Sequence, residues 1–71
     1  MLNGGEKMRI DRLKLRMELA KRDMTQIKLA ELAGVSRATI GYIVGGKSCS
    51  DIIGIKIANA LEVPIEKLLE K

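Results

Sequence analysis

Apolar residues recur at helical spacing along most of the chain, and short polar or glycine-containing stretches interrupt the pattern. The first such segment covers residues 9–22 and predicts a helix with a broad buried face. Leu15 and Leu19 form one apolar line of that face. A neighbouring line consists of Ile10, Leu13, Met17 and Ala20. We expect the rest of the helix surface, which carries its basic residues, to face solvent.

Residues 25–46 predict two short helices joined by a tight turn. Thr25 is a typical N-cap for the first helix and Ser36 for the second, because a hydroxyl accepts a hydrogen bond from a free backbone N–H at a helix start. Gly34 stands in the turn, where a left-handed backbone is needed, and a pair of glycines ends the second helix. Helices this short are unstable alone in water, so the flanking segments must pack against them.

The second of these helices, over residues 36–44, has two different sides. Ile40 and Ile43 lie on the side that we expect to face the core. The other side carries Arg37, Ala38, Gly41 and Tyr42, with Thr39 at the border. A narrow polar face is therefore expected to point outward, and the helix pair is expected to present it.

A fourth helix is predicted through Leu61, after a polar loop. Its isoleucines fall at different helical angles and cover more of its circumference than the core of one small domain requires; they are Ile52, Ile53, Ile55 and Ile57. Some of this apolar surface is expected to meet a partner. Pro64 suits the first turn of a final short helix. The pattern predicts an all-α fold of five helices without a strand.

The length of 71 residues is that of one small domain, and its core must be aliphatic because the chain has no Phe, no Trp and one Tyr. Residues 1–8 contain paired glycines and no periodicity, and they predict a disordered tail. Residues 9–71 form the expected domain, with the helix-turn-helix at 25–45.

The composition narrows the possible function. A formal net charge of +4 and a pI near 9.5 favour a polyanionic partner. The single cysteine, Cys49, excludes an internal disulfide, and the lack of His argues against a zinc site. No nucleophile–base pair or metal cluster is apparent in the sequence, so we expect neither an enzyme nor a cofactor. No apolar run reaches the roughly 18 residues of a membrane span, and a soluble cytoplasmic protein is expected.

Spaced positions over residues 13–69 carry a specific resemblance. They include Thr25-Gln26, Leu29-Ala30, Ala33-Gly34-Val35-Ser36-Arg37, Thr39-Ile40, Ile43 and Gly46-Lys47, followed by Ile57-Ala58 and Ala60-Leu61-Glu62-Val63. The chain resembles the phage-repressor/Cro-type helix-turn-helix family, also called XRE-like regulators. The resemblance implies a compact five-helix, lambda-repressor-like domain whose third helix enters the DNA major groove while the second lies across the DNA backbone.

The resemblance also implies roles for single residues. Gln26, the first residue of the second helix, resembles the family's residue that hydrogen-bonds a backbone phosphate. Ser36, Arg37 and Ala38 resemble the residues at the start of the reading helix, which base edges approach. Arg37 can form paired hydrogen bonds to a guanine or bind a phosphate, and both alternatives stay open. Ala38 can offer a methyl contact to thymine.

The remaining candidate DNA contacts lie later in the reading helix and in the loop after it. Thr39 is expected to meet phosphate or sugar rather than a base. Tyr42, the only aromatic residue, is expected to contact DNA through its hydroxyl or ring edge. Lys47 and Ser48 resemble family positions that touch the phosphate backbone. Because the reading helix carries a single charge, we expect sparse base readout and a contribution from dimer spacing and DNA shape.

These features predict a sequence-specific regulator of transcription, a repressor, that binds double-stranded DNA as a homodimer with half-sites about 34 Å apart. The candidate dimer interface consists of Val44, Ile52, Ile53 and Ile65. The alternative is a protein-binding module on the same fold, either an antitoxin that binds a toxin or an adaptor that contacts RNA polymerase. No small-molecule ligand is expected.

Overall fold

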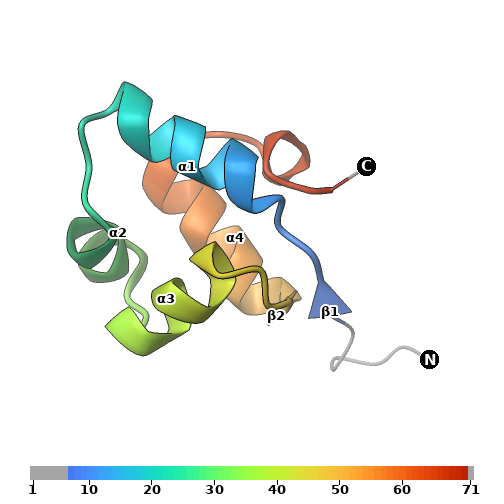
Figure 1. Ribbon diagram of the computed structural model, residues 1–71. Helices are drawn as coiled ribbons and strands as arrows, with labels where there is room; N and C mark the ends of the chain where they lie inside the picture. Colours follow the sequence, from blue (N-terminus) through green and yellow to red (C-terminus); the bar gives the residue numbers. More distant parts are fainter. Residues whose placement is uncertain (1–6, 71) are drawn as a thin grey trace.

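The computed structural model describes residues 7–70, in which four α-helices pack around one core and a pair of short strands lies at the edge (Figure 1). In chain order the elements are β1 (Lys7–Met8), α1 (Arg12–Lys21), α2 (Gln26–Ala33), α3 (Arg37–Val44), β2 (Cys49–Ser50), α4 (Asp51–Leu61) and the 3-10 helix η1 (Ile65–Lys67). The prediction of five helices was wrong, because the segment after Pro64 forms only a 3-10 turn. The prediction of no strand was also wrong.

The strand pair joins the start of the described chain to the segment before α4. β1 and β2 are antiparallel, with Met8 opposite Cys49. The predicted disordered tail over residues 1–8 was therefore too long, because Lys7 and Met8 form β1. Residues 1–6 of that tail lie outside the described residues. Gly54 leaves room for this arrangement, because a Cβ at that position would collide with the sulfur of Met8.

α1 begins later than the apolar pattern indicated, because Asp11 caps it. The Asp11 carboxylate accepts hydrogen bonds from the backbone N–H groups of Leu13 at 2.8 Å and Lys14 at 3.2 Å. Ile10 therefore precedes the helix, forms an isolated β-bridge with Leu69 and is buried.

α1 buries a narrower face than predicted. Leu15 and Leu19 are buried as expected, whereas Leu13 and Met17 are 65% and 63% exposed and Ala20 is exposed as well. α1 lies on the outside of the domain, with one side toward the other helices (Figure 1). The second apolar line, apart from Ile10, consequently faces solvent, and the prediction of a broad buried face was wrong there.

The two short helices form as predicted. The hydroxyl of Thr25 accepts a hydrogen bond from the N–H of Lys28 at 3.0 Å and starts α2. Gly34 ends α2 with a φ of 73°, in the left-handed region where a Cβ is unfavourable. α2 packs against both α3 and α4, which supplies the stability that helices of this length lack on their own.

The core is aliphatic and draws on all four α-helices. Its largest fully buried side chains are Ile10, Leu15, Leu29, Ile40, Ile43, Ile57, Leu61 and Leu68. Val44 is only 4% exposed and belongs to the same cluster, so its expected place in a dimer interface was wrong. On α4, by contrast, Ile52 and Ile55 remain 67% and 47% exposed.

Candidate nucleic-acid interface

The start of α3 is held by two hydroxyl groups that bond to each other. Ser36 Oγ accepts a hydrogen bond from the backbone N–H of Thr39 at 3.1 Å and donates to Thr39 Oγ1 at 2.8 Å. The two hydroxyl groups therefore share one hydrogen bond at the start of α3. The two predicted contacts differ in exposure: Ser36 is exposed, and Thr39 is half-buried.

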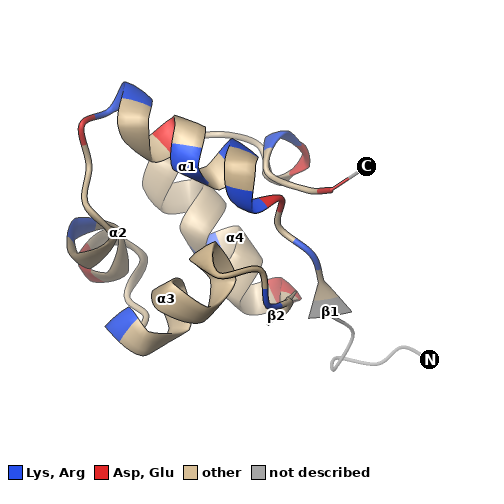
Figure 2. Ribbon diagram, viewed as in Figure 1, with Lys and Arg blue, Asp and Glu red and all other residues tan. Residues whose placement is uncertain are grey.

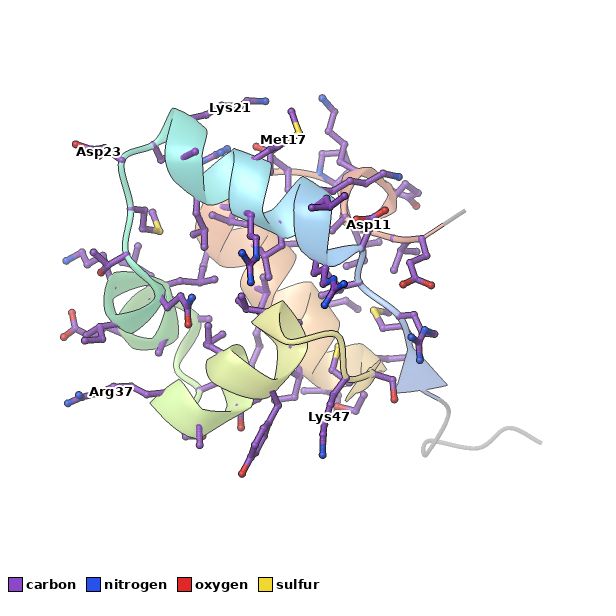
Figure 3. The ribbon with its side chains drawn as sticks, viewed as in Figure 1. Asp11, Met17, Lys21, Asp23, Arg37 and Lys47 are labelled. Carbon is purple, nitrogen blue, oxygen red and sulfur yellow. The ribbon has the colours of Figure 1, made fainter. Side chains whose placement is uncertain are left out.

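Arg37 and Ala38 follow on the exposed side of the same helix. Arg37 is exposed, and no acidic side chain within residues 7–70 forms an ion pair with it. Figure 3 shows Arg37 projecting away from the domain at the N-terminal end of α3. Gly41, one turn further along, is exposed as well, and a Cβ there would have no neighbour within 4 Å. The outer side of α3 therefore carries one cation, Arg37, and only small residues at Ala38 and Gly41.

Tyr42 is 59% exposed, in agreement with its predicted place on the outer side of α3. The ammonium group of Lys47, in the loop after α3, lies 5.2 Å from the centre of the Tyr42 ring. Sequence reasoning assigned both residues to the site but missed their contact. Lys47 projects outward beside α3, as Arg37 does from the other end (Figure 3).

The other two predicted DNA contacts lie at either side of α3 along the chain. Gln26 is the first residue of α2 and is exposed, and Ser48 is half-buried between α3 and β2. Neither side chain forms a hydrogen bond within the described part of the chain. The structure therefore links Ser36 with Thr39 and Tyr42 with Lys47, but it does not join Gln26 or Ser48 to either pair.

Positive charge on this part of the surface is sparse and lies at the ends of α3. In Figure 2, α3 is coloured for charge only where Arg37 begins it, and a further basic segment follows in the loop that carries Lys47. Sequence reasoning missed a third cation, because Arg12 belongs to α1. Its side chain passes within 3.8 Å of the position that a Cβ on Gly46 would occupy, next to the end of α3.

The described residues hold no group of three or more His, Cys, Asp or Glu side chains arranged to bind a metal. Cys49 is buried, and this burial, with a smaller contribution from Asp51, raises the pKa of its thiol. A raised pKa disfavours the reactive thiolate. Between residues 7 and 70 there is also no helix of the length and apolarity needed to cross a membrane.

The geometry of α2 and α3 defines the class of this protein. Two short helices meet at a left-handed glycine, and the second presents its outer face to solvent. A helix-turn-helix family model matches residues 13–68. The chain belongs to the phage-repressor/Cro-type helix-turn-helix family of DNA-binding domains, as the resemblance of its sequence predicted.

Two solved structures of similar length resemble the whole domain. The restriction-modification controller protein C.AhdI from Aeromonas hydrophila is 27% identical with a TM-score of 0.75, covering 82% of this chain and 89% of that one. The transcriptional regulator VanUg is 26% identical with a TM-score of 0.75, covering 99% of this chain and 93% of its own. No match was found among curated proteins.

A much larger protein contains a similar domain. A mutant of hydroxyethylphosphonate dioxygenase is 28% identical over 90% of this chain, with a TM-score of 0.80. The chain spans only 14% of the length of that enzyme. This likeness therefore concerns one helical part of the dioxygenase and not the whole of it.

Proposed function

We propose that the protein binds double-stranded DNA in a sequence-specific manner and regulates transcription, with α3 inserted into the major groove. The observation that carries this proposal is the exposed start of α3, where Arg37 has no acidic partner among residues 7–70 while Ile40 and Ile43 anchor the opposite side. A helix anchored on one side presents its polar side chains at fixed positions, which base recognition requires.

Each exposed group has a matching feature on DNA. The guanidinium of Arg37 fits the two acceptors of a guanine edge, or else a phosphate, and the methyl group of Ala38 fits the methyl of thymine. Gln26 and Ser48, without hydrogen bonds among the described residues, are proposed to bind backbone phosphates. The hydroxyl of Thr39, at the start of α3, is proposed to meet phosphate or sugar.

The first test is binding to a pool of genomic duplexes at several salt concentrations. Wild type is expected to select particular fragments and to lose affinity steeply with salt. Arg37→Ala is expected to relax the selection if Arg37 reads a base, and Gln26→Ala to weaken all fragments alike. Lys67→Ala, which removes an exposed cation from η1, is the charge-matched control and should leave selection unchanged. Absence of wild-type binding at low salt would refute the proposal.

We propose further that the DNA-bound form is a homodimer whose interface includes α4. Ile52 and Ile55 lie on the same side of α4 and leave large exposed apolar surfaces, whereas Ile53 and Ile65 are half-buried against the core of their own chain. Analytical ultracentrifugation of Ile52→Lys against wild type is the test. A wild-type protein that stays monomeric at tens of micromolar, with DNA present, would refute the dimer.

A repressor is the proposed form of regulation, because a dimer that covers a promoter excludes RNA polymerase by occupying the same DNA. A reporter placed behind a selected fragment should lose expression when the protein is supplied and regain it with Arg37→Ala. Increased expression on supplying the wild-type protein would show activation instead.

An exposed apolar line on α1 supports a second candidate function, the binding of another protein. Leu13 and Met17 stand one turn apart with most of their side chains exposed, and Arg16 beside them is exposed too. Figure 3 shows Met17 at the edge of the domain opposite to Lys47. A partner protein whose surface is acidic and carries apolar side chains would fit this line while α3 remains bound to DNA. The candidate partners are a toxin or RNA polymerase.

The double variant Leu13→Ser/Met17→Ser separates this function from DNA binding. Purified RNA polymerase, and any toxin encoded beside the gene, would be titrated against wild type and the variant. The variant is expected to lose the protein partner while it keeps its DNA affinity. Equal partner binding by wild type and the variant would exclude α1 as the docking surface.

A further inference from the structure

The end of α3 has a backbone geometry that places two particular side chains together. The N–H of Gly46 donates to the carbonyl of Ile43 at 2.9 Å, and the N–H of Lys47 donates to the carbonyl of Tyr42 at 2.9 Å. Gly46 takes a φ of 108°, which reverses the chain after the last helical turn. This pair of hydrogen bonds is a common way to end a helix on a glycine.

In such helix ends the residue after the glycine usually packs an apolar side chain against the residue five positions earlier. Here those two positions hold Lys47 and Tyr42, and the usual apolar contact is replaced by an ammonium group 5.2 Å from the centre of an aromatic ring. Both residues are exposed. The helix end therefore fixes a cation beside the outer face of α3, where a solvated lysine would sample many rotamers.

We infer that Tyr42 is a positioning residue for Lys47, whose ammonium group it holds ready for a DNA phosphate next to the reading helix. The ring attracts the cation through its negatively polarised face and leaves N–H donors of the ammonium free. Ordering the long side chain before binding lowers the entropy lost when the phosphate contact forms. This inference rests on the proposed DNA binding.

The positioning of Lys47 depends on the aromatic ring of Tyr42 and not on its hydroxyl. A direct contact through the hydroxyl would be lost in Tyr42→Phe, whereas positioning of Lys47 needs only the ring. Tyr42→Leu removes the ring and keeps an apolar side chain. Lys47→Met removes the charge and keeps a long unbranched chain. Together these variants separate the ring, the hydroxyl and the cation.

The test is a double-mutant cycle on a fragment that wild type selects, at fixed low salt. Tyr42→Phe is expected to bind within about twofold of wild type, and Tyr42→Leu about threefold or more weakly, a factor typical of an exposed cation–ring contact. In the Lys47→Met background, Tyr42→Leu should have no further effect. Lys47→Met should also lower the salt slope by about one phosphate contact.

A second readout concerns the free protein. Protons of the Lys47 side chain should show a ring-current shift by NMR in wild type and in Tyr42→Phe, and this shift should vanish in Tyr42→Leu. A role of Tyr42 in fold stability alone would not make its effect on DNA binding depend on the charge of Lys47.

Three results would overturn the inference. Additive losses from Tyr42→Leu and Lys47→Met would show that the two side chains act independently, although DNA binding itself stands. An equal loss in Tyr42→Phe and Tyr42→Leu would assign the effect to the hydroxyl. Absence of DNA binding by wild type would remove both the proposed function and this inference.

Discussion

Glu18 on α1 and Arg22, the residue that caps the end of α1, form an ion pair of 2.6 Å, and the same guanidinium donates to the carbonyl of Leu61 at 2.7 Å. Glu18 is the one charged residue with a buried side chain among the described residues. Because the carbonyl of Leu61 is at the end of α4, Arg22 joins the last turn of α1 to the last turn of α4. The buried carboxylate keeps that guanidinium in place.

The first prediction concerns acid. The hydrogen bond from Arg22, helped by Lys21, holds the pKa of Glu18 below its ordinary value of 4.5, although burial acts in the opposite direction. A carboxyl whose pKa is lowered by folding stabilises the fold above its unfolded pKa, and this contribution disappears as the pH falls through the folded pKa. We expect the free energy of unfolding to decrease as the pH drops below about 4.5, measured by urea unfolding at a series of pH values.

Glu18→Gln provides the control for this pH dependence. It is expected to reduce the free energy of unfolding by about 2 kcal/mol at pH 7, because a charge-assisted hydrogen bond becomes a neutral one in a buried position. Its stability should depend less on pH than that of wild type over the acid range. Parallel pH curves for the two proteins would show that other carboxylates dominate.

Gly41→Ala should stabilise the fold. Gly41 lies inside α3 without a left-handed backbone, and an added Cβ would meet no atom within 4 Å. The change therefore gains helix propensity without a steric cost, which is worth about 1 kcal/mol. Denaturant unfolding measures the gain, and a lower midpoint with unchanged m-value would contradict it.

Gly34→Ala makes the same chemical change as Gly41→Ala, but it is expected to destabilise the fold. No atom lies within 4 Å of the new Cβ here either, but Gly34 has a φ of 73°. A side chain in the left-handed region costs about 1 kcal/mol or more. We expect a loss of that size in the free energy of unfolding. A thermal midpoint equal to or above that of wild type would show that the turn between α2 and α3 rearranges to accept alanine.

Glu62→Gly should stabilise the end of α4. Glu62 adopts a φ of 60° at the C-terminal end of the helix, a conformation that glycine takes without strain. After allowance for the greater freedom of glycine in the unfolded chain, the expected gain is about 0.5–1 kcal/mol. Glu62→Ala keeps the strain and serves as the control. A gain in both variants would point to the lost charge and not to the backbone.

Caps and turns of the helix-turn-helix could be predicted from the sequence because they depend on near neighbours. Thr25 bonds to Lys28 and Ser36 to Thr39, each three residues away, and Gly34 is needed where the backbone turns left-handed. The resemblance to the family uses the same local positions. The inner residues of α3 were also predicted correctly, because Ile40 and Ile43 form one side of a helix with a clear polar counterpart.

Features that depend on distant segments could not be read in this way. Helical spacing groups Leu13 with Met17 but does not tell whether another element covers them, and in the structure none of the described elements does. β1 forms a strand only because β2, which is distant in the sequence, pairs with it. The sequence pattern places Val44 in a candidate dimer interface, whereas the packing of the helices buries it in the core.

The sequence by itself determined the class of the protein, since the caps, the turn glycine and the apolar spacing act within a few residues of one another. Only the tertiary structure decided which apolar side chains stay exposed and which polar groups meet. Burial depends on how the helices pack, and the ring of Tyr42 meets the ammonium of Lys47 because a left-handed Gly46 turns the chain back over the end of α3. Those contacts follow from three-dimensional geometry, which residue spacing alone does not predict.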